Sequence, residues 1–318
     1  MKVCTNTKTH LGNVKKWNSQ IKYHSELVSK NVLITGATGQ LGSELKDLID
    51  IDNKSLFQFF YTGSKDLDIT QLEEVDRFVD KFAIDYIINC AAYTMVDLCE
   101  ADIDLCNSVN YKGAENLAKV ASKSECKLIH ISTDYVFDGE SETPYTEDSQ
   151  VNPLSVYGKA KVKAEETVKL IAPDSIIIRT AWLYSSYKIN FVKTMLRLMD
   201  ERDELTIVND QHGTPTYARD LAEAILIILD AAENGGWKEG IYHFSNLGAT
   251  TWFGFAKKIK SFCNIEKCKL TPIETKDYPT AAVRPPYTVL DKTKIQDTFS
   301  FIIPKWEKSL ERFLTKLN

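Results

Sequence analysis

One stretch decides the fold: Asn31-Val32-Leu33-Ile34-Thr35-Gly36-Ala37-Thr38-Gly39-Gln40-Leu41-Gly42. Its apolar start predicts a short buried strand, and three glycines spaced G-x-x-G-x-x-G follow directly. Gly36 permits a tight turn, Gly39 lets the backbone approach a pyrophosphate, and Gly42 allows close packing of helix on strand. The free N–H groups at the start of the helix attract phosphate. A glycine turn between strand and helix therefore predicts a dinucleotide-binding site.

Strand and helix patterns alternate outward from this turn. Strands are expected at 32–35, 56–61, 86–89, 127–132 and 175–179, and helices at 41–51, 73–82, 101–123 and 155–171. Such alternation implies parallel strands with helices on both faces of the sheet. After Trp182 the alternation loosens, with helices expected at 191–199, 217–232, 252–262 and 306–317 and a strand at 241–245.

We therefore predict an α/β fold: a Rossmann-type doubly wound parallel sheet with a smaller, mixed α/β substrate lobe. The expected dinucleotide-binding domain comprises residues 31–181 and about 216–246. The expected sugar-nucleotide-binding lobe comprises about 182–215 and 247–318. Residues 1–30 carry six lysines and one acid, Glu26, and we expect a surface extension there. A targeting or partner-binding tail is the alternative for this segment.

Composition excludes several classes of protein. With 318 residues, 43% hydrophobic and 26% charged, the chain is globular rather than disordered. No run approaches the roughly 20 apolar residues of a membrane span. A net charge of −5 argues against a nucleic-acid binder. The seven cysteines form no C-x-x-C pair, and no His or carboxylate cluster has metal-ligand spacing, so we expect reduced thiols, a cytoplasmic location and no metal.

A second pattern indicates catalysis. Tyr157 and Lys161 are four residues apart and share one face of the expected helix. A nearby ammonium stabilises a phenolate and lowers the tyrosine pKa from about 10. Thr133 follows the strand expected at 127–132, where ligands of open α/β sheets bind. We predict that Ser132, Thr133 and Tyr157 polarise a substrate carbonyl that receives hydride from a nicotinamide.

The end of the second expected strand bears on the choice of cofactor. NAD sites usually carry an acid there for the ribose hydroxyls, and this chain has Ser64 and Lys65 instead. Both side chains suit a 2′-phosphate, which favours NADPH and leaves NADH as the alternative. Asp66 or Asp68 is the other candidate for the adenosine end.

These segments resemble the extended short-chain dehydrogenase/reductases and, within them, the dTDP-4-dehydrorhamnose reductase family. The most specific matches are Ser132-Thr133-Asp134-Tyr135-Val136-Phe137-Asp138-Gly139 and Asn209-Asp210-Gln211-His212-Gly213-Thr214-Pro215-Thr216. The resemblance covers about residues 31–315. A departure is Ser185-Ser186-Tyr187-Lys188-Ile189, where many members of the family have glycine-containing sequence, so the path of this loop is open.

The resemblance implies an activity and a set of roles. The family reduces the C4 keto group of dTDP-4-dehydro-L-rhamnose (dTDP-6-deoxy-L-lyxo-4-hexulose) to dTDP-L-rhamnose with NAD(P)H, and often forms dimers, so we expect a homodimer. By carry-over, Thr133 orients the carbonyl, Tyr157 donates the proton, and Lys161 binds the ribose and tunes Tyr157. The cofactor set is Gly36, Thr38, Gly39, Gln40, Leu41, Gly42, Ser64, Asp68, Ile69, Ala91, Ala92, Thr94, Tyr157 and Lys161. The substrate set is Val96, Thr133, Asp134, Tyr135, Trp182, Asn190 and Arg284.

Two alternative functions remain open from the sequence. The chain is a candidate reductase of another nucleotide-linked 4-keto sugar. It is also similar to the non-catalytic, NADP-binding regulatory subunit of methionine adenosyltransferase, whose relatives can keep all three residues of the catalytic set.

Overall fold

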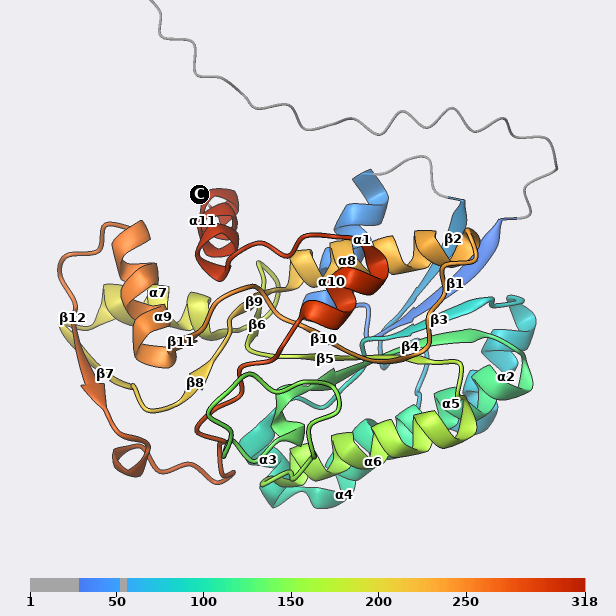
Figure 1. The fold of residues 1–318 in the computed structure, drawn as a ribbon, viewed down its shortest axis with the longest axis horizontal. Helices are drawn as coiled ribbons and strands as arrows, with labels where there is room; N and C mark the ends of the chain where they lie inside the picture. The colour runs from blue at the N-terminus through green and yellow to red at the C-terminus, as the bar shows by residue number, and fades with distance from the viewer. Residues whose placement is uncertain (1–28, 52–55, 318) are drawn as a thin grey trace, which may run out of the picture.

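A parallel sheet of six strands forms the centre of the computed structural model, which describes residues 29–51 and 56–317 (Figure 1). The strands lie in the order β2-β1-β3-β4-β5-β10 and all neighbours pair in parallel. The apolar runs of the sequence supply them, since β3 and β5 are buried along their whole length. Their bounds are β1 Lys30–Thr35, β2 Phe57–Thr62, β3 Tyr86–Asn89, β4 Lys127–Thr133, β5 Ile176–Thr180 and β10 Gly240–Phe244.

Helices cover both faces of this sheet, as the predicted doubly wound fold requires (Figure 1). On one face lie α1 (Gln40–Ile51), α8 (Ala218–Glu233) and α10 (Thr293–Phe299). On the other lie α2 (Leu72–Lys81), α5 (Gly113–Lys123) and α6 (Val156–Ile171). The predicted fold class is confirmed, and each expected strand of the sheet is present with its ends shifted by one or two residues at most.

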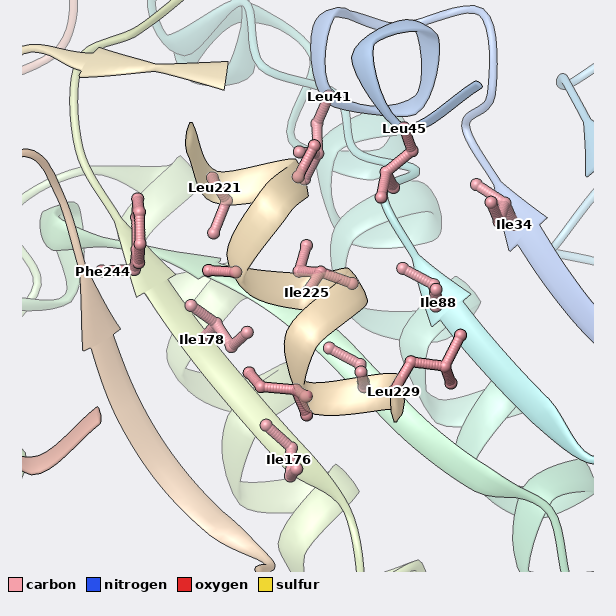
Figure 2. Packing of buried hydrophobic residues seen from close by; sticks show 14 of the residues in the cluster. Ile34, Leu41, Leu45, Ile88, Ile176, Ile178, Leu221, Ile225, Leu229 and Phe244 are labelled. Carbon is pink, nitrogen blue, oxygen red and sulfur yellow. The ribbon is translucent and has the colours of Figure 1, made fainter. Parts of the chain in front are cut away.

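The core under α8 shows how helix periodicity produces this layer. Leu221, Ile225 and Leu229 recur every four residues along one side of the helix and face the sheet (Figure 2). They pack over Ile176 and Ile178 of β5, and all five side chains are fully buried. Burial of each such side chain contributes about 1.5–3 kcal/mol, so this contact holds α8 firmly on β5.

The direction in which the sheet is built reverses beside β1. From β1 the chain first forms β2 at the outer edge, and then crosses to β3 on the opposite side of β1. The carboxyl ends of β1 and β3, at Thr35 and Asn89, therefore border the switch point of the sheet. In open α/β sheets a ligand crevice forms at such a point.

A second lobe packs beyond the carboxyl ends of the strands (Figure 1). Its core combines Tyr184, Phe255 and Phe313, which are fully buried. Strand β7 pairs with β12 in parallel, β6 pairs with β9 in parallel, and β8 pairs with β11 antiparallel. Its elements are β6 Leu183–Tyr184, α7 Phe191–Glu201, β7 Glu204–Val208, β8 His212–Gly213, β9 Thr216–Tyr217, β11 Thr250–Thr251, α9 Trp252–Phe262, β12 Lys269–Ile273, the 3-10 turn Thr275–Asp277 and α11 Trp306–Leu317.

The helix expected at 101–123 is present from Ile103 to Lys123, but it begins two residues later and contains a π-helical turn. The chain forms α3 (Val96–Ala101), α4 (Ile103–Asn107), a π-helical turn (Ser108–Lys112) and then α5. The break falls at Asp102, which leaves the helical region at φ −125° and ψ 75° and caps α4 by accepting a hydrogen bond from the Leu105 N–H. Aspartate favours caps over helix interiors because its carboxylate bonds free N–H groups.

Residues near the C-terminus return to the sheet. Ile295 and Phe299 of α10 lie one turn apart and pack in the same core cluster as α8, so this part of 247–318 does not lie with the second lobe. The proposed division into two domains otherwise stays a prediction. The expected extension at 1–30 falls outside the described residues except for Ser29 and Lys30. Within residues 29–51 and 56–317, no helix is long and apolar enough to cross a membrane.

The glycine turn is required by space as well as by conformation. Gly36 has a φ of +64°, and a Cβ placed on it would lie 2.6 Å from the backbone nitrogen of Ala91. A Cβ on Gly42 would lie 2.5 Å from the Cα of Ala37, so the start of α1 presses on the turn itself. Real Cβ atoms do not come this close, and the chain can pass here only as glycine.

We predict that Gly36→Ala destabilises the protein more than a matched substitution elsewhere. Gly235 has a similar φ of +72°, but a Cβ there would meet nothing within 4 Å. Gly235→Ala should cost about 1–2 kcal/mol through the left-handed backbone alone. Gly36→Ala should cost a further 1–3 kcal/mol or so, because Ala91 must move. Urea unfolding of both variants measures the difference, and equal midpoints would contradict the close approach.

Candidate active site

A cavity of about 590 Å³ lies beyond the carboxyl ends of the strands and reaches the second lobe. It brings together Thr133, Tyr157 and Lys161, which come from β4 and from α6. The expected catalytic set therefore shares one space, although 24 to 28 positions separate Thr133 from the other two. From the expected substrate set, the cavity is lined by Val96, Thr133, Asp134, Tyr135, Trp182 and Asn190.

A second cavity of about 220 Å³ continues from the first along the glycine turn. Gly39, Cys90 and Ala92 border both, so the two cavities form one groove over the switch point. A Cβ on Gly39 would meet only the Gly36 carbonyl oxygen, at 3.1 Å, which leaves its remaining surroundings open. From the expected cofactor set, the second cavity is lined by Gly36, Thr38, Gly39, Ser64, Asp68, Ile69, Ala91 and Ala92, and the first by Gly39, Gln40, Leu41, Ala92, Thr94, Tyr157 and Lys161. Gly42 lines neither, because it packs against the turn.

Tyr157 stands in the first turn of α6. The helix begins there because the Ser155 hydroxyl caps it, accepting a hydrogen bond from the Gly158 N–H at 3.1 Å. Burial raises the pKa of Tyr157, and a hydrogen bond with Thr133 opposes that rise. The phenol is therefore protonated at neutral pH, which is the form that a proton donor needs. Burial has the largest effect on this pKa, and the expected lowering of the Tyr157 pKa by Lys161 stays a prediction.

Lys161 is fully buried and its amine is directed at the sheet. Nζ donates to the Ile131 carbonyl at 2.6 Å and lies 3.1 Å from Nε2 of His130. Burial lowers the pKa of Lys161 to about 8, although Glu165 and Cys106 both favour the charged form. The amine therefore titrates near neutral pH, where a surface lysine stays charged.

Ser132 lines the cavity, but its hydroxyl is bonded to a buried carboxylate, so its expected role toward a substrate carbonyl stays a prediction. Its hydroxyl donates to Glu165 at 2.5 Å, and Glu165 is held by the Arg179 guanidinium at 2.7 Å. Glu165 and Arg179 are buried, and a buried charge needs such a partner. Thr133, from the same strand end, lines the cavity and contacts Tyr157.

Asp134 opens a short 3-10 turn (Asp134–Val136) and places a carboxylate at the cavity. Its Oδ1 accepts from the Thr133 hydroxyl at 3.1 Å, while its Oδ2 is buried without a hydrogen-bond partner. Burial raises its pKa to about 6, and the nearby Thr288 and Thr133 side chains oppose that rise. An unpartnered buried oxygen at a cavity wall is suited to accept a hydrogen bond from a bound hydroxyl.

Two indole rings form one wall of the cavity. Trp182 stacks on Trp252 with ring centroids 3.5 Å apart and an interplanar angle of 8°. Trp182 adopts a left-handed φ of +45°, and a Cβ on Gly213 would lie 2.6 Å from its ring. The sequence placed Trp182 in the site but did not indicate Trp252, for which its position at the start of the helix expected at 252–262 is the available signal.

Other expected residues have structural bonds of their own. Asn190 caps α7 through its Oδ1 and donates from Nδ2 to Gln40 at 3.1 Å, which ties the second lobe to the glycine turn. Arg284 does not line the cavity, since its guanidinium forms a two-pronged ion pair with Asp97 at 2.6 and 2.9 Å. Its substrate role stays a prediction.

The loop Ser185–Ile189, whose sequence differs from that of many family members, borders the cavity. Lys188 and Ile189 line it and are exposed, and the Tyr187 hydroxyl donates to Asp47 of α1 at 2.6 Å, which anchors the loop. Lys188 and Ile189 belong to the segment whose path could not be predicted from the sequence, so the sequence did not indicate that they line the cavity. The cavity residues that were missed are Cys90, Ile131, Thr180, Ala181, Leu183, Lys188, Ile189 and Trp252.

Neither a metal cluster nor a disulfide contributes to the site within residues 29–51 and 56–317. No group of three or more His, Cys, Asp or Glu side chains there is placed to hold a metal ion. The six cysteines in this part of the chain are free thiols.

A Rossmann-type sheet with a tyrosine and a lysine of one helix face at its switch point defines the class of extended short-chain dehydrogenase/reductases. A family model described as "RmlD substrate binding domain" matches residues 30–318. The chain belongs to the dTDP-4-dehydrorhamnose reductase family.

Three relatives illustrate the match. The dTDP-4-dehydrorhamnose reductase of Aggregatibacter actinomycetemcomitans is 41% identical over 286 residues, covering 88% of this chain and 97% of that protein. The spore coat polysaccharide biosynthesis protein SpsK of Bacillus subtilis is 37% identical, covering 89% and 96%. The crystal structure of dTDP-4-dehydrorhamnose reductase from Bacillus anthracis in complex with NADP superposes with a TM-score of 0.85 at 38% identity, covering 91% and 100%.

We predict that Asp134→Asn stabilises the protein at neutral pH. The pKa of this carboxyl is raised from 3.8 to about 6 by folding, so ionisation above pH 6 costs the native state free energy. The variant should be more stable by roughly 3 kcal/mol above pH 6, and the gain should vanish below about pH 4.

A neighbouring carboxyl provides the control with the opposite sign. Hydrogen bonds lower the pKa of Asp138, so Asp138→Asn should lose stability at pH 7 and lose none in acid. Chemical denaturation across the pH range measures both variants. A stability gain for Asp134→Asn that persisted unchanged in acid would contradict the raised pKa.

Proposed function

We propose that this protein reduces the C4 keto group of dTDP-4-dehydro-L-rhamnose to dTDP-L-rhamnose, with NADPH as the preferred cofactor and NADH as the alternative. One observation carries the proposal: Thr133, Tyr157 and Lys161 face a single cavity that continues into the groove over the glycine turn. Bound NADPH supplies the hydride for such a reduction. Membership of the reductase family supports the same reaction.

The roles of the three side chains follow from their surroundings. Tyr157 is protonated and donates its proton to the developing alkoxide oxygen of the substrate. Thr133 lies in hydrogen-bond contact with Tyr157 and orients the carbonyl. Lys161 stabilises the phenolate that remains, and it binds the nicotinamide ribose hydroxyls from below the groove.

The groove residues support a dinucleotide. The N–H groups at the start of α1 face phosphate, with Gly39 leaving space for its approach. Ser64 lies at the far end of the groove, after β2, and supports recognition of a 2′-phosphate. Asp68 lies there too, but its carboxylate accepts hydrogen bonds from the N–H and the hydroxyl of Thr70, which favours a structural role. This arrangement favours NADPH, the reduced form of the molecule bound in the Bacillus anthracis structure.

The opposite wall suits a sugar. Asp134 presents an unpartnered carboxylate oxygen to accept from a sugar hydroxyl, and Trp182 offers an apolar surface for the deoxy sugar ring. Lys188 stands at the rim as a cation for a diphosphate. The proposal also includes a homodimer acting in the cytoplasm, both of which stay predictions.

We predict that Tyr157→Phe reduces turnover by about 10²–10⁴-fold, because the phenol that donates the proton is lost. NADPH binding should be retained, since the ring and Lys161 remain. The measurement is the loss of reduced-nicotinamide absorbance with the dTDP-linked 4-keto-L-sugar generated in place by the upstream enzymes.

The matched control is Tyr278→Phe, which removes the hydroxyl of a tyrosine that is 58% exposed. It should turn over like the unaltered protein. Normal turnover of Tyr157→Phe would refute the assigned proton donor. No turnover of the unaltered protein, with NADPH bound, would redirect the assignment to another nucleotide-linked keto sugar.

A further inference from the structure

Two buried polar side chains stand behind Lys161 and do not line the cavity. Asn89 ends β3 and His130 lies in β4, and each is 1% exposed. They form a continuous series of hydrogen bonds that ends on the Lys161 amine. The proposed reaction uses neither of them, so their role has to be read from the direction of these bonds.

The backbone fixes that direction at one end. The Ala91 N–H donates to Oδ1 of Asn89 at 3.1 Å, and the Thr35 hydroxyl donates to the same oxygen at 2.7 Å. A backbone N–H always carries its proton, so the amide of Asn89 cannot be turned around. Its Nδ2 therefore faces Nδ1 of His130, at 2.9 Å, and donates to it.

The bond from Asn89 determines which nitrogen of the His130 ring carries the proton. Because Nδ1 accepts from Asn89, the single proton of a neutral ring is on Nε2. Burial and the neighbouring Lys161 lower the pKa of His130 well below its usual value, so the ring is neutral. The Nε2–H group therefore points at Lys161 Nζ, 3.1 Å away.

An ammonium cannot accept this hydrogen bond. A charged lysine has three N–H donors and no lone pair, whereas the neutral amine has one lone pair. Nζ accepts from His130 only in its neutral form, and it then donates to the Ile131 carbonyl at 2.6 Å. The other groups that act on Lys161 are Glu165 and Cys106, which favour the charge, and burial, which opposes it.

We propose that Asn89 and His130 are positioning residues that keep Lys161 as a neutral amine, turned toward the Ile131 carbonyl, in the resting protein. The His130 N–H favours the neutral amine, as does burial, which lowers the pKa of Lys161 to about 8. The consequence for turnover rests on the proposed function: the phenolate left at Tyr157 needs an ammonium, so activity falls as pH rises through the Lys161 pKa. The state of the His130 ring is independent of that function.

Asn89→Asp is the decisive variant because it reverses the direction of the hydrogen bond between residue 89 and His130. The carboxylate still accepts from Ala91 and Thr35, but it now also accepts from His130, which moves the ring proton to Nδ1. Nε2 then presents a lone pair, which stabilises the Lys161 ammonium. Thr35→Val is the matched control, since it also alters a contact of Asn89 but leaves Nδ2 as the donor.

The first measurement is the histidine tautomer in the ligand-free protein. Long-range ¹H–¹⁵N correlation spectra of ¹⁵N-histidine-labelled protein at pH 9, where an amine with a pKa of about 8 is neutral, are assigned with His130→Gln. They should show protonated Nε2 in the unaltered protein and in Thr35→Val. Asn89→Asp should show protonated Nδ1. A folded, unaltered protein with Nδ1 protonated, or with both nitrogens protonated, would overturn the proposal.

The second measurement is the pH profile of kcat/KM with NADPH. Its alkaline limb should lie at or below pH 8 in the unaltered protein. It should move up by roughly one pH unit or more in Asn89→Asp. If Asn89→Asp does not fold, His130→Gln replaces it, because its amide oxygen can accept from the ammonium and should give the same upward shift.

The two measurements separate the possible failures. An unmoved limb in an active variant would overturn control of Lys161 by His130. The expected tautomers in a protein that turns over no 4-keto sugar would support the proposal and refute the proposed function instead.

Discussion

The structure depends on how closely the turn after β1 approaches the chain after β3. At Gly36 there is no room for a Cβ beside the backbone of Cys90 and Ala91, and the local φ is positive. This contact joins the two strand ends where the sheet changes direction, so the groove forms directly above it. The hydrogen bond between the Thr35 hydroxyl and Asn89, at 2.7 Å, lies at the same two strand ends. It helps to orient the Asn89 amide, which begins the hydrogen bonds that lead through His130 to Lys161.

Helix α6 is held to the sheet by polar contacts as much as by apolar ones. Glu165 links to Ser132 of β4 and Arg179 of β5, while Lys161, one turn earlier, reaches Ile131 and His130 of β4. Burying these groups would be costly if any of them lacked a partner. Since each one has a partner, α6 has one rotational setting on the sheet, and that setting points Tyr157 into the cavity.

Local patterns predicted the parts that depend on nearby residues. The Val32–Thr35 run became β1, the glycine turn follows it, and the spacing of Tyr157 and Lys161 placed both on the cavity side of α6. Asp102 broke an otherwise helical pattern because its side chain captured the Leu105 N–H, a competition that periodicity alone does not register. Arg284 is ion-paired with Asp97, 187 positions earlier in the chain, and no local pattern indicates a contact over that distance.

The sequence by itself determined the layered α/β architecture, the dinucleotide groove and the identity of the residues that meet above it. These features follow from apolar periodicity, glycine spacing and strand ends, which are written into short stretches of chain. Only the tertiary structure decided how those residues are charged and which groups they bond: Lys161 donates to the Ile131 carbonyl, Ser132 bonds to Glu165, and Asp134 keeps one oxygen unpartnered. Burial and partners drawn from distant strands set these states, because the free energy of a charge depends on what surrounds it in space.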